Sequence, residues 1–364
     1  MKNDDLIYNL GFSYCLGIGP MKYHGLKRYF NNIKKAYLAS RKELGKVLGL
    51  KLTERFIEFR QKFDPVKELE KLKVNGITVL SADDENYPQS LKNISDPPIC
   101  LYVRGNLESV AKSRILFSIV GTRQPTPYGI QIAYKFSREL AESGFIIVSG
   151  LAKGIDAIAH KASLDVEGKT IAVLGCGVDI VYPAENQQLY RRIIEKDSLI
   201  ISEFPPGQTV VKGLFIARNR IISGLSKGVM IVEGTKDSGS LITARYAAEQ
   251  GKDIFAPPSS ITSNMSAAPN LLLKQGAKLV TSVEDIMEEF DMKITPRKKE
   301  DIRKNLDETG KLIFDILQKS PQTVDDVAIN LHKTVPEVLN AISTMEIENV
   351  VEKNQEHKYQ IKLR

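Results

Sequence analysis

The residues best suited to bind an anion lie in glycine-containing loops, each of which follows a short apolar run. Arg123 follows one such run, and the loop after the next run contains Ser149, Gly150 and Lys153. A loop that opens a helix points free backbone N–H groups at a ligand, and a nearby cation adds attraction for negative charge. We therefore expect these loops to bind phosphate groups.

The loop around Arg123 also contains a helix start. Thr126 is a good N-cap residue and Pro127 is a good first helical residue, so a helix with free N–H groups opens there. This predicts an anion site beside Arg123. The preceding strand lacks a GxGxxG sequence after it, and a Walker A sequence occurs nowhere in the chain, which disfavours dinucleotide and Walker-type nucleotide binding.

A third cluster combines cations with an aromatic residue and consists of Lys212, Phe215, Arg218, Asn219 and Arg220. Cations meet the phosphates of a nucleic-acid strand, and an aromatic ring stacks on an unpaired base. Phe215 is suited either to such stacking or to the hydrophobic core, and its place before a polar run keeps both interpretations open.

A fourth loop places Ser238, Gly239 and Ser240 ahead of a helix, where backbone N–H groups again face outward. No single loop of this kind is specific. Several along one sheet edge fit a chain of phosphates better than one small ligand, so the pattern favours a polynucleotide.

Asp156 and His160 are one helical turn apart and raise the question of a general-base pair. His160 has no nucleophile beside it in the sequence, and Asp156 is equally suited to cap a turn or to hold a neighbouring arginine. We favour the structural interpretation and expect no catalytic residue.

The elements that position these loops follow one repeated pattern of a β-branched apolar run, a glycine-containing loop and a helical stretch. Strands that are apolar throughout and separated by helices form a parallel sheet covered on both faces. The fold class is therefore α/β, a Rossmann-like doubly wound, mostly parallel sheet whose ligands bind at the carboxyl ends of the strands. The predicted strands are 115–120, 145–148, 170–174, 199–202, 228–232, 253–256 and 277–280.

Four regions are predicted along the chain: a helical domain over 1–75, the Rossmann-like domain over 76–290, a charged linker over 291–305 and a winged-helix domain over 306–364. Within the first region, LGIGPMKYHGLKRYF resembles a helix-hairpin-helix motif, whose turn aims backbone N–H groups at a phosphate. The alternative is a glycine-turned helix pair that only packs.

The formal net charge of +7 suggests a polyanionic partner. Residues 1–75 carry 16 Lys and Arg against 8 Asp and Glu, whereas the rest of the chain is balanced, so the helical region holds the excess.

No apolar run reaches the roughly 20 residues that span a bilayer, and the N-terminus is acidic, so we expect a soluble, cytoplasmic protein. Cys15, Cys100 and Cys176 are widely spaced, which predicts buried apolar residues and neither a disulfide framework nor a zinc site. No metal or cofactor is expected.

From Ile77 to Ile286 the sequence resembles the DNA-processing protein A family (DprA, also called Smf). The matching strings include SGLAKGIDAIAH, GKTIAVLGCGVDIVYPAEN, ARNRIISGLS and VEGTKDSGSLITARYAAEQGKDIFAPP. The resemblance implies a homodimer without enzymatic activity that binds single-stranded DNA without sequence preference and loads the recombinase RecA onto it during natural transformation. One departure is APPSSITS, where family members usually have Pro-Gly after the strand.

The resemblance implies a DNA-binding pocket made of the same loop residues that were identified above. Lys212 and Phe215 match the family's pocket less closely than the other residues do. It also places a dimer contact near Leu271, Leu272 and Leu273, three consecutive leucines that one short helix cannot bury together. The pocket residues are Arg123, Ser149, Gly150, Lys153, Arg218, Asn219, Arg220, Ser238 and Ser240.

Two other functions are weighed against this one. A nucleotide phosphoribohydrolase of the lysine-decarboxylase-like group needs a Glu directly after a Gly-Thr turn, but Thr235 is followed by Lys236 and Asp237. A winged-helix transcription regulator needs a cationic recognition helix, but 334–350 contains Glu and neither Lys nor Arg. Protein docking or simple packing suits that helix better.

Overall fold

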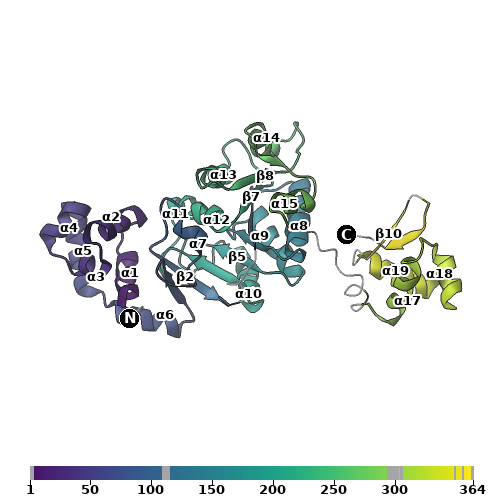
Figure 1. The fold of residues 1–364 in the computed structure, drawn as a ribbon, viewed down its shortest axis with the longest axis horizontal. Coiled ribbons are helices and arrows are strands. Elements are labelled where there is room, and N and C mark those ends of the chain that lie inside the picture. The colour runs from purple at the N-terminus through teal and green to yellow at the C-terminus, as the bar shows by residue number, and fades with distance from the viewer. Residues whose placement is uncertain are drawn as a thin grey trace. The chain divides into compact units, whose positions relative to one another are not determined.

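The computed structural model describes residues 4–108, 115–292, 303, 306–347, 350–354 and 356–361. The chain divides into two compact units, Met1–Ile286 and Met287–Arg364, which are described separately (Figure 1). The predicted linker falls mostly outside the described residues. Within them, no helix is long and apolar enough to cross a membrane.

The first unit is built on a nine-stranded sheet of order β1-β2-β6-β5-β4-β3-β7-β8-β9. Strands β3 to β9 pair in parallel, while β1 and β2 are antiparallel to each other and β2 is antiparallel to β6. The predicted doubly wound, mostly parallel sheet is confirmed. The strands are β1 Thr78–Ser81, β2 Cys100–Gly105, β3 Leu116–Val120, β4 Ile146–Ser149, β5 Thr170–Val173, β6 Leu199–Ser202, β7 Gly228–Ile231, β8 Asp253–Ala256 and β9 Lys278–Leu279.

Alternate residues of the central strands enter two different cores. Ala172 and Ile200 pack on one face of the sheet, whereas their neighbours Ile171, Val173 and Ile201 pack on the other. This follows from the two-residue period of a strand, and it explains why the strands are apolar throughout. The helices over the sheet are α7 Gln89–Lys92, α8 Pro127–Glu142, α9 Ile155–Asp165, α10 Gln187–Glu195, α11 Lys212–Ala217, α12 Asn219–Leu225, α13 Gly239–Glu249, α14 Ala267–Lys274 and α15 Val283–Glu289.

The sheet order reverses at β3. The chain proceeds from β3 through β4 and β5 to β6 on one side, then returns to β7 on the other side of β3. The loops after these strands therefore gather at one edge, which we call the carboxyl edge. Such a switch point is the usual ligand position in an open α/β sheet.

The N-terminal helices share a core with the sheet. Phe12, Tyr23 and Phe56 belong to the same buried cluster as Cys100 and Tyr102 of β2. The region predicted as a separate domain thus packs on the edge of the sheet within the first unit, and its boundary near residue 75 stays a prediction. These helices are α1 Asp4–Tyr14, α2 Pro20–Phe30, α3 Ile33–Leu38, α4 Arg41–Leu48, α5 Leu50–Lys62 and α6 Pro65–Val74.

Between residues 306 and 361, the described part of the second unit forms three helices followed by a hairpin, and the winged-helix domain stays a prediction. The helices are α17 Glu308–Leu317, α18 Val324–Leu331 and α19 Val335–Ile347, and the hairpin pairs β10 Val351–Lys353 with β11 Tyr359–Ile361. Gln322 adds an isolated bridge to Tyr359. Thr323 and Asp326 form a capping box that starts α18.

Candidate nucleic-acid interface

Arg218 joins the loops that follow two neighbouring strands of the carboxyl edge. Its guanidinium is buried, and Nη1 donates to the carbonyl oxygen of Gly150 at 2.6 Å and to that of Val173. A Cβ on Gly150 would lie 2.2 Å from Nη2 of Arg218, so only glycine fits there. Arg218 therefore holds the loops in place and is not free for a ligand, contrary to its predicted contact with DNA.

Asp156 completes this arrangement. Its carboxylate accepts from the backbone N–H groups of Gly150 at 3.2 Å and Ala152 at 3.4 Å, and lies 3.9 Å from Nη2 of Arg218. Burial raises the pKa of Asp156, while Arg218 opposes that shift. Asp156 both caps a turn and holds an arginine, which is the structural interpretation that the sequence favoured.

His160 is fully buried and its two ring nitrogens have different roles. The Thr170 hydroxyl donates to the carbonyl of Ile147, so Nδ1 of His160 must donate to Thr170 Oγ1, 2.6 Å away. Nε2 then accepts from the backbone N–H of Leu151 at 3.3 Å. Burial, with the charge of Arg218, lowers the pKa of His160 to about 3. The imidazole is a neutral structural link.

This shift predicts acid sensitivity. In the unfolded chain the imidazole of His160 binds a proton below about pH 6.5, whereas in the folded protein it does so only near pH 3. The neutral imidazole therefore contributes its full share to the free energy of unfolding above pH 6.5. That contribution decreases as the pH falls from 6.5 toward 3. Between pH 6.5 and 5 the loss is about 2 kcal/mol. Chemical denaturation at several pH values measures it. His160→Gln should show a flatter pH dependence, and an unchanged one would contradict this origin.

Arg220 is also buried, although it was predicted to bind DNA. Its Nε lies 2.8 Å from a carboxylate oxygen of Asp96, and its Nη2 pairs with the carboxylate of Glu203. Burial raises the pKa of Glu203, and Arg220 opposes that shift. Asp96 lies in the segment before β2 and Glu203 directly after β6, so Arg220 fastens α12 to the sheet rather than facing a phosphate.

The anion site predicted at the start of α8 is filled by the protein's own carboxylate. Glu233, which is buried two residues after the end of β7, accepts from the backbone N–H of Thr126 at 2.9 Å and from its hydroxyl at 2.6 Å. The backbone carbonyl of Glu233 accepts from Thr122 N–H at 2.8 Å. A Cβ on Gly129 would lie 2.1 Å from Glu233 Oε2, so glycine admits the carboxylate. The prediction of a free anion site was wrong.

Arg123 lies between these two anchored threonines and remains exposed. Its guanidinium carbon is 5.9 Å from the centre of the Phe215 ring. Because Glu233 fixes the loop on both sides, Arg123 projects from a rigid support. Arg123 is one of the cations that the sequence predicted at this edge, and its contact with DNA stays a prediction.

Phe215 forms the centre of an aromatic platform, by which we mean Phe215 and Tyr182. The two ring centres are 5.3 Å apart with the planes at 49°, and Tyr182 is 41% exposed. Phe215 is half-buried, and a Cβ on Gly175 would lie 3.0 Å from its ring, so the platform rests on the loop after β5. Arg218 lies 5.9 Å from the Phe215 ring centre, the same separation as Arg123.

Tyr182 was not among the predicted site residues. The available signal was its position in the loop after the strand at 170–174, because an aromatic residue there lies at the same edge as the cations. Glu233 was missed in the same way, since an acidic residue directly after a buried strand also lies at that edge.

The remaining predicted residues divide into exposed and supporting groups. Lys153 is exposed and pairs with Glu185, and Lys212 is exposed at the start of α11. Asn219 accepts from Arg218 Nε at 3.1 Å and donates to the Gly239 carbonyl at 3.4 Å.

The three predicted serines have local roles. Ser149 is fully buried and donates to the carbonyl of Ile119 at 2.7 Å. Ser238 is the N-cap of α13 and accepts from Ser240 N–H, while Ser240 itself is buried. Neither Ser149 nor Ser240 offers its hydroxyl to a ligand, which corrects their predicted contact role.

The three leucines on α14 differ in exposure. Leu271 is 40% exposed, Leu272 is 7% exposed and packs in the core, and Leu273 is half-buried. At least one leucine faces outward, as predicted, but Leu272 is used by the chain's own core. Cys15, Cys100 and Cys176 are buried and unpaired.

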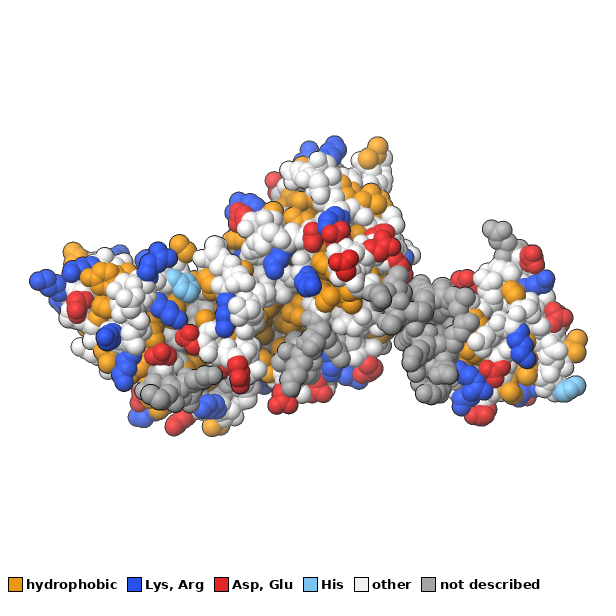
Figure 2. All heavy atoms as spheres, viewed as in Figure 1, with side chains coloured by type: hydrophobic (Ala, Val, Ile, Leu, Met, Phe, Trp, Pro, Cys, Tyr) orange, Lys and Arg blue, Asp and Glu red, His pale blue; other side chains and the backbone are white. Residues whose placement is uncertain are grey.

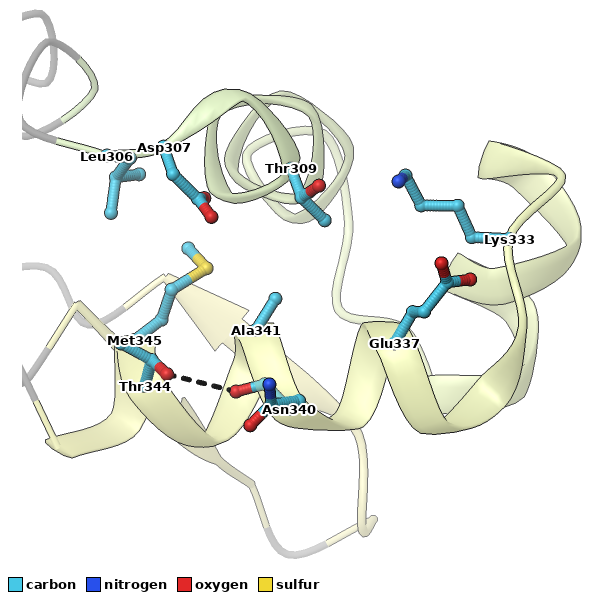
Figure 3. Close-up of a pocket in the computed structure, with 9 residues that line it drawn as sticks. All are labelled: Leu306, Asp307, Thr309, Lys333, Glu337, Asn340, Ala341, Thr344 and Met345. Atoms are coloured by element: carbon cyan, nitrogen blue, oxygen red, sulfur yellow. Dashed lines mark hydrogen bonds between the residues drawn. The ribbon is translucent and has the colours of Figure 1, made fainter.

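The second unit has a pocket of about 450 Å³ between the start of α17 and α19 (Figure 3). Its two carboxylates cap helices: Asp307 accepts from Gly310 N–H, and Glu337 accepts from Thr334 N–H. Lys333 is the one cation of its lining. The α19 segment contains neither Lys nor Arg, so this helix differs from the cationic helix with which a winged helix reads duplex DNA.

Comparison with known proteins places this geometry in a family. A family profile described as DNA recombination-mediator protein A matches residues 78–291. Protein Smf from Synechocystis is 40% identical over 291 residues, which are 79% of this chain and 73% of that protein. DNA processing protein DprA from Bacillus subtilis is 45% identical over 215 residues, which are 59% of this chain and 72% of that protein.

Solved structures agree with the sequence comparison. DNA processing protein A from Streptococcus pneumoniae superposes with a TM-score of 0.69 at 37% identity, covering 79% of this chain and 99% of that one. The Helicobacter pylori protein, described with its single-stranded DNA binding mode, has a TM-score of 0.53 at 33% identity and covers 59% of this chain and 95% of that one. The chain belongs to the DNA recombination-mediator protein A family.

Proposed function

We propose that this protein binds single-stranded DNA at the carboxyl edge of its sheet. The observation that carries the proposal is the exposed Arg123 above the platform of Phe215 and Tyr182. An unpaired base stacks on an aromatic face, and a neighbouring guanidinium meets the phosphate beside that base. The single-stranded DNA binding of the Helicobacter pylori relative supports the same assignment.

Within this proposal the site has two layers. Arg123, Lys153 and Lys212 are the exposed cations that contact phosphates, and Phe215 with Tyr182 stacks on bases. The second layer positions them and consists of Ser149, Gly150, Arg218, Asn219, Arg220, Glu233, Ser238 and Ser240.

Fluorescence anisotropy with labelled oligonucleotides tests this function. We expect tighter binding to a single strand than to a blunt duplex of the same length, with little dependence on sequence. The affinity should fall steeply with salt, because bound cations release counterions from the strand. A blunt duplex that displaces the single strand with equal affinity would falsify the proposal, and so would single-strand binding that is insensitive to salt.

We further propose that the bound strand is handed to the recombinase RecA in the cytoplasm, during natural transformation, and that the protein acts by binding rather than by catalysis. Membership of the recombination-mediator family supports the hand-over. RecA-dependent ATP hydrolysis on single-stranded DNA should start sooner in the presence of the protein. Release of free base from nucleoside monophosphates would instead indicate an enzyme.

A homodimer through α14 is also proposed, since a second copy would lengthen the DNA track and add avidity. Leu271 is the exposed leucine of this helix and Leu273 is half-buried. We expect wild type to sediment as a dimer, and Leu271→Glu to give a folded monomer with weaker DNA binding. A wild type that stays monomeric at micromolar concentration, or a Leu271→Glu protein that stays dimeric, places the interface elsewhere.

A further inference from the structure

The helical part of the first unit has a strongly basic stretch that the proposed single-strand site does not use. Between Cys15 and Arg55 the chain carries ten Lys and Arg but only two carboxylates, Glu43 and Glu54. Glu43 is engaged in the capping box of α4, and Glu54 pairs with Arg41. Figure 2 shows more Lys and Arg than acidic side chains on the visible face of this part, at the left. Of the ten cations, Arg41 pairs with Glu54 and Lys27 pairs with Asp83 outside the stretch, so cations still outnumber the carboxylates beside them.

Two helix-connecting turns meet within this stretch. Gly17 lies between α1 and α2 with a φ of 99°, and Gly49 lies between α4 and α5 with a φ of 75°, both in the left-handed region. A Cβ on Gly17 would lie 3.1 Å from Leu52 Cδ1. Arg55 Nη1 donates to the carbonyl of Leu16 at 3.4 Å. The two turns thus form one surface.

A shallow cavity of about 390 Å³ opens between the turns. We call the surface around it the hairpin surface, defined by its lining residues. Three of them are cations, and none carries a carboxylate or an aromatic ring. The lining is Gly17, Lys22, Leu48, Gly49, Leu50, Lys51, Leu52 and Arg55.

The three cations are available for a partner. Lys22, Lys51 and Arg55 are exposed, and the described part of the chain contains no ion pair that involves any of them. Each turn also exposes one leucine, Leu16 at 69% and Leu50 at 81%. Exposed Lys and Arg side chains are the usual contacts to the phosphates of a DNA backbone.

We propose that the hairpin surface is a second DNA-binding site, which holds the phosphodiester backbone of duplex DNA. The absence of an aromatic ring in its lining distinguishes it from the platform at the carboxyl edge, because unpaired bases need a ring to stack on. A backbone-only contact needs no unpaired base and is independent of sequence. The first unit then contains one site for the single strand and one for duplex DNA.

Anisotropy with full-length protein tests the proposal with two probes, a blunt duplex of roughly 20 base pairs and a single strand of roughly 10 nucleotides. The variant reverses the three cations, Lys22→Glu, Lys51→Glu and Arg55→Glu. We expect its duplex affinity to fall at least about tenfold, and the slope of log affinity against log salt to shrink by about three units. Its affinity for the short single strand should change less than about twofold.

A matched control separates a local surface from net charge. The control variant changes the net charge of the same helical part by the same amount as the hairpin variant does. Its three substitutions lie at exposed positions outside the hairpin surface and are Lys35→Glu, Lys62→Glu and Lys73→Glu. This control should retain most of the duplex affinity. An equal loss in the control, an unchanged duplex affinity in the hairpin variant, or an equal loss of both probes overturns the proposal.

A second variant guards against misfolding. Lys22→Gln with Lys51→Gln retains Arg55 and its bond to Leu16, and should lose duplex affinity with an unchanged thermal midpoint. A different result would contradict the proposed single-strand site: Arg123→Ala would then bind the single strand as tightly as wild type. That outcome would leave the effect of the hairpin variant on duplex affinity unchanged.

Discussion

Arg123→Ala is expected to weaken binding to single-stranded DNA by about tenfold to a hundredfold, the usual range for one lost hydrogen bond to a charged group. The salt slope should shrink by about one unit, because one phosphate contact disappears. The thermal midpoint should stay near that of wild type, since Arg123 is exposed and lies outside the core. Anisotropy and thermal melting measure the two quantities.

The platform beneath Arg123 provides a matched test of the same site. Phe215→Leu retains an apolar side chain against Gly175 but removes the ring, and stacking is worth about 1–3 kcal/mol per base. Tyr182→Leu does the same for the second ring. If Arg123→Ala binds normally while Phe215→Leu does not, stacking alone carries the site and the role of Arg123 is wrong.

We expect Lys153→Ala to weaken single-strand binding less than Arg123→Ala does, as measured by the same anisotropy titration. Its ammonium group pairs with Glu185, an exposed carboxylate, so DNA must compete with that partner. We therefore rank Lys153 below Arg123, although the sequence treated them alike.

The strands and their loops were predictable because their signals are local. Each central strand is mostly apolar and buried along its whole length, which is typical of a parallel sheet covered on both faces. Thr126 and Pro127 start α8 where the sequence placed them, because capping depends on neighbouring residues only. The carboxyl edge then follows from the topology of parallel strands.

The sequence spacing of the arginines did not predict which of them are buried and which are exposed. Arg218 and Arg220 are buried because they pair with groups that are remote in the sequence. Arg218 donates to the backbone carbonyl of Val173, and Arg220 pairs with the carboxylate of Asp96. Glu233 likewise reaches Thr126 across 107 positions. Local patterns identify a cation but not the partner that neutralises it. The apolar residues after Arg220, beginning with Ile221, were the available hint that this segment is buried.

Arg220→Ala is expected to destabilise the first unit by about 3–5 kcal/mol, the usual cost of removing one partner of a buried ion pair. The side chain of Glu203 is 7% exposed and would be left in the interior without its cation. Each kcal/mol lowers the thermal midpoint of a large domain by about 2–4 °C. Thermal melting should therefore separate Arg220→Ala clearly from Arg123→Ala.

A paired substitution distinguishes lost pairing from lost packing. Arg220→Met with Glu203→Gln removes the two buried charges while filling similar volume, and leaves Asp96, whose side chain is 30% exposed, in contact with solvent. This variant should recover part of the stability, since a buried pair is often replaceable by uncharged groups. Arg220→Ala should also weaken binding to single-stranded DNA, because Arg220 supports α12 and, through it, the platform residue Phe215. The double variant should recover part of that affinity, since Arg220 does not itself touch the strand. A stable Arg220→Ala protein that no longer binds DNA would contradict this supporting role. It would indicate that the Arg220 guanidinium leaves Glu203 and contacts a phosphate when DNA binds, so that the ion pair forms only in the DNA-free protein.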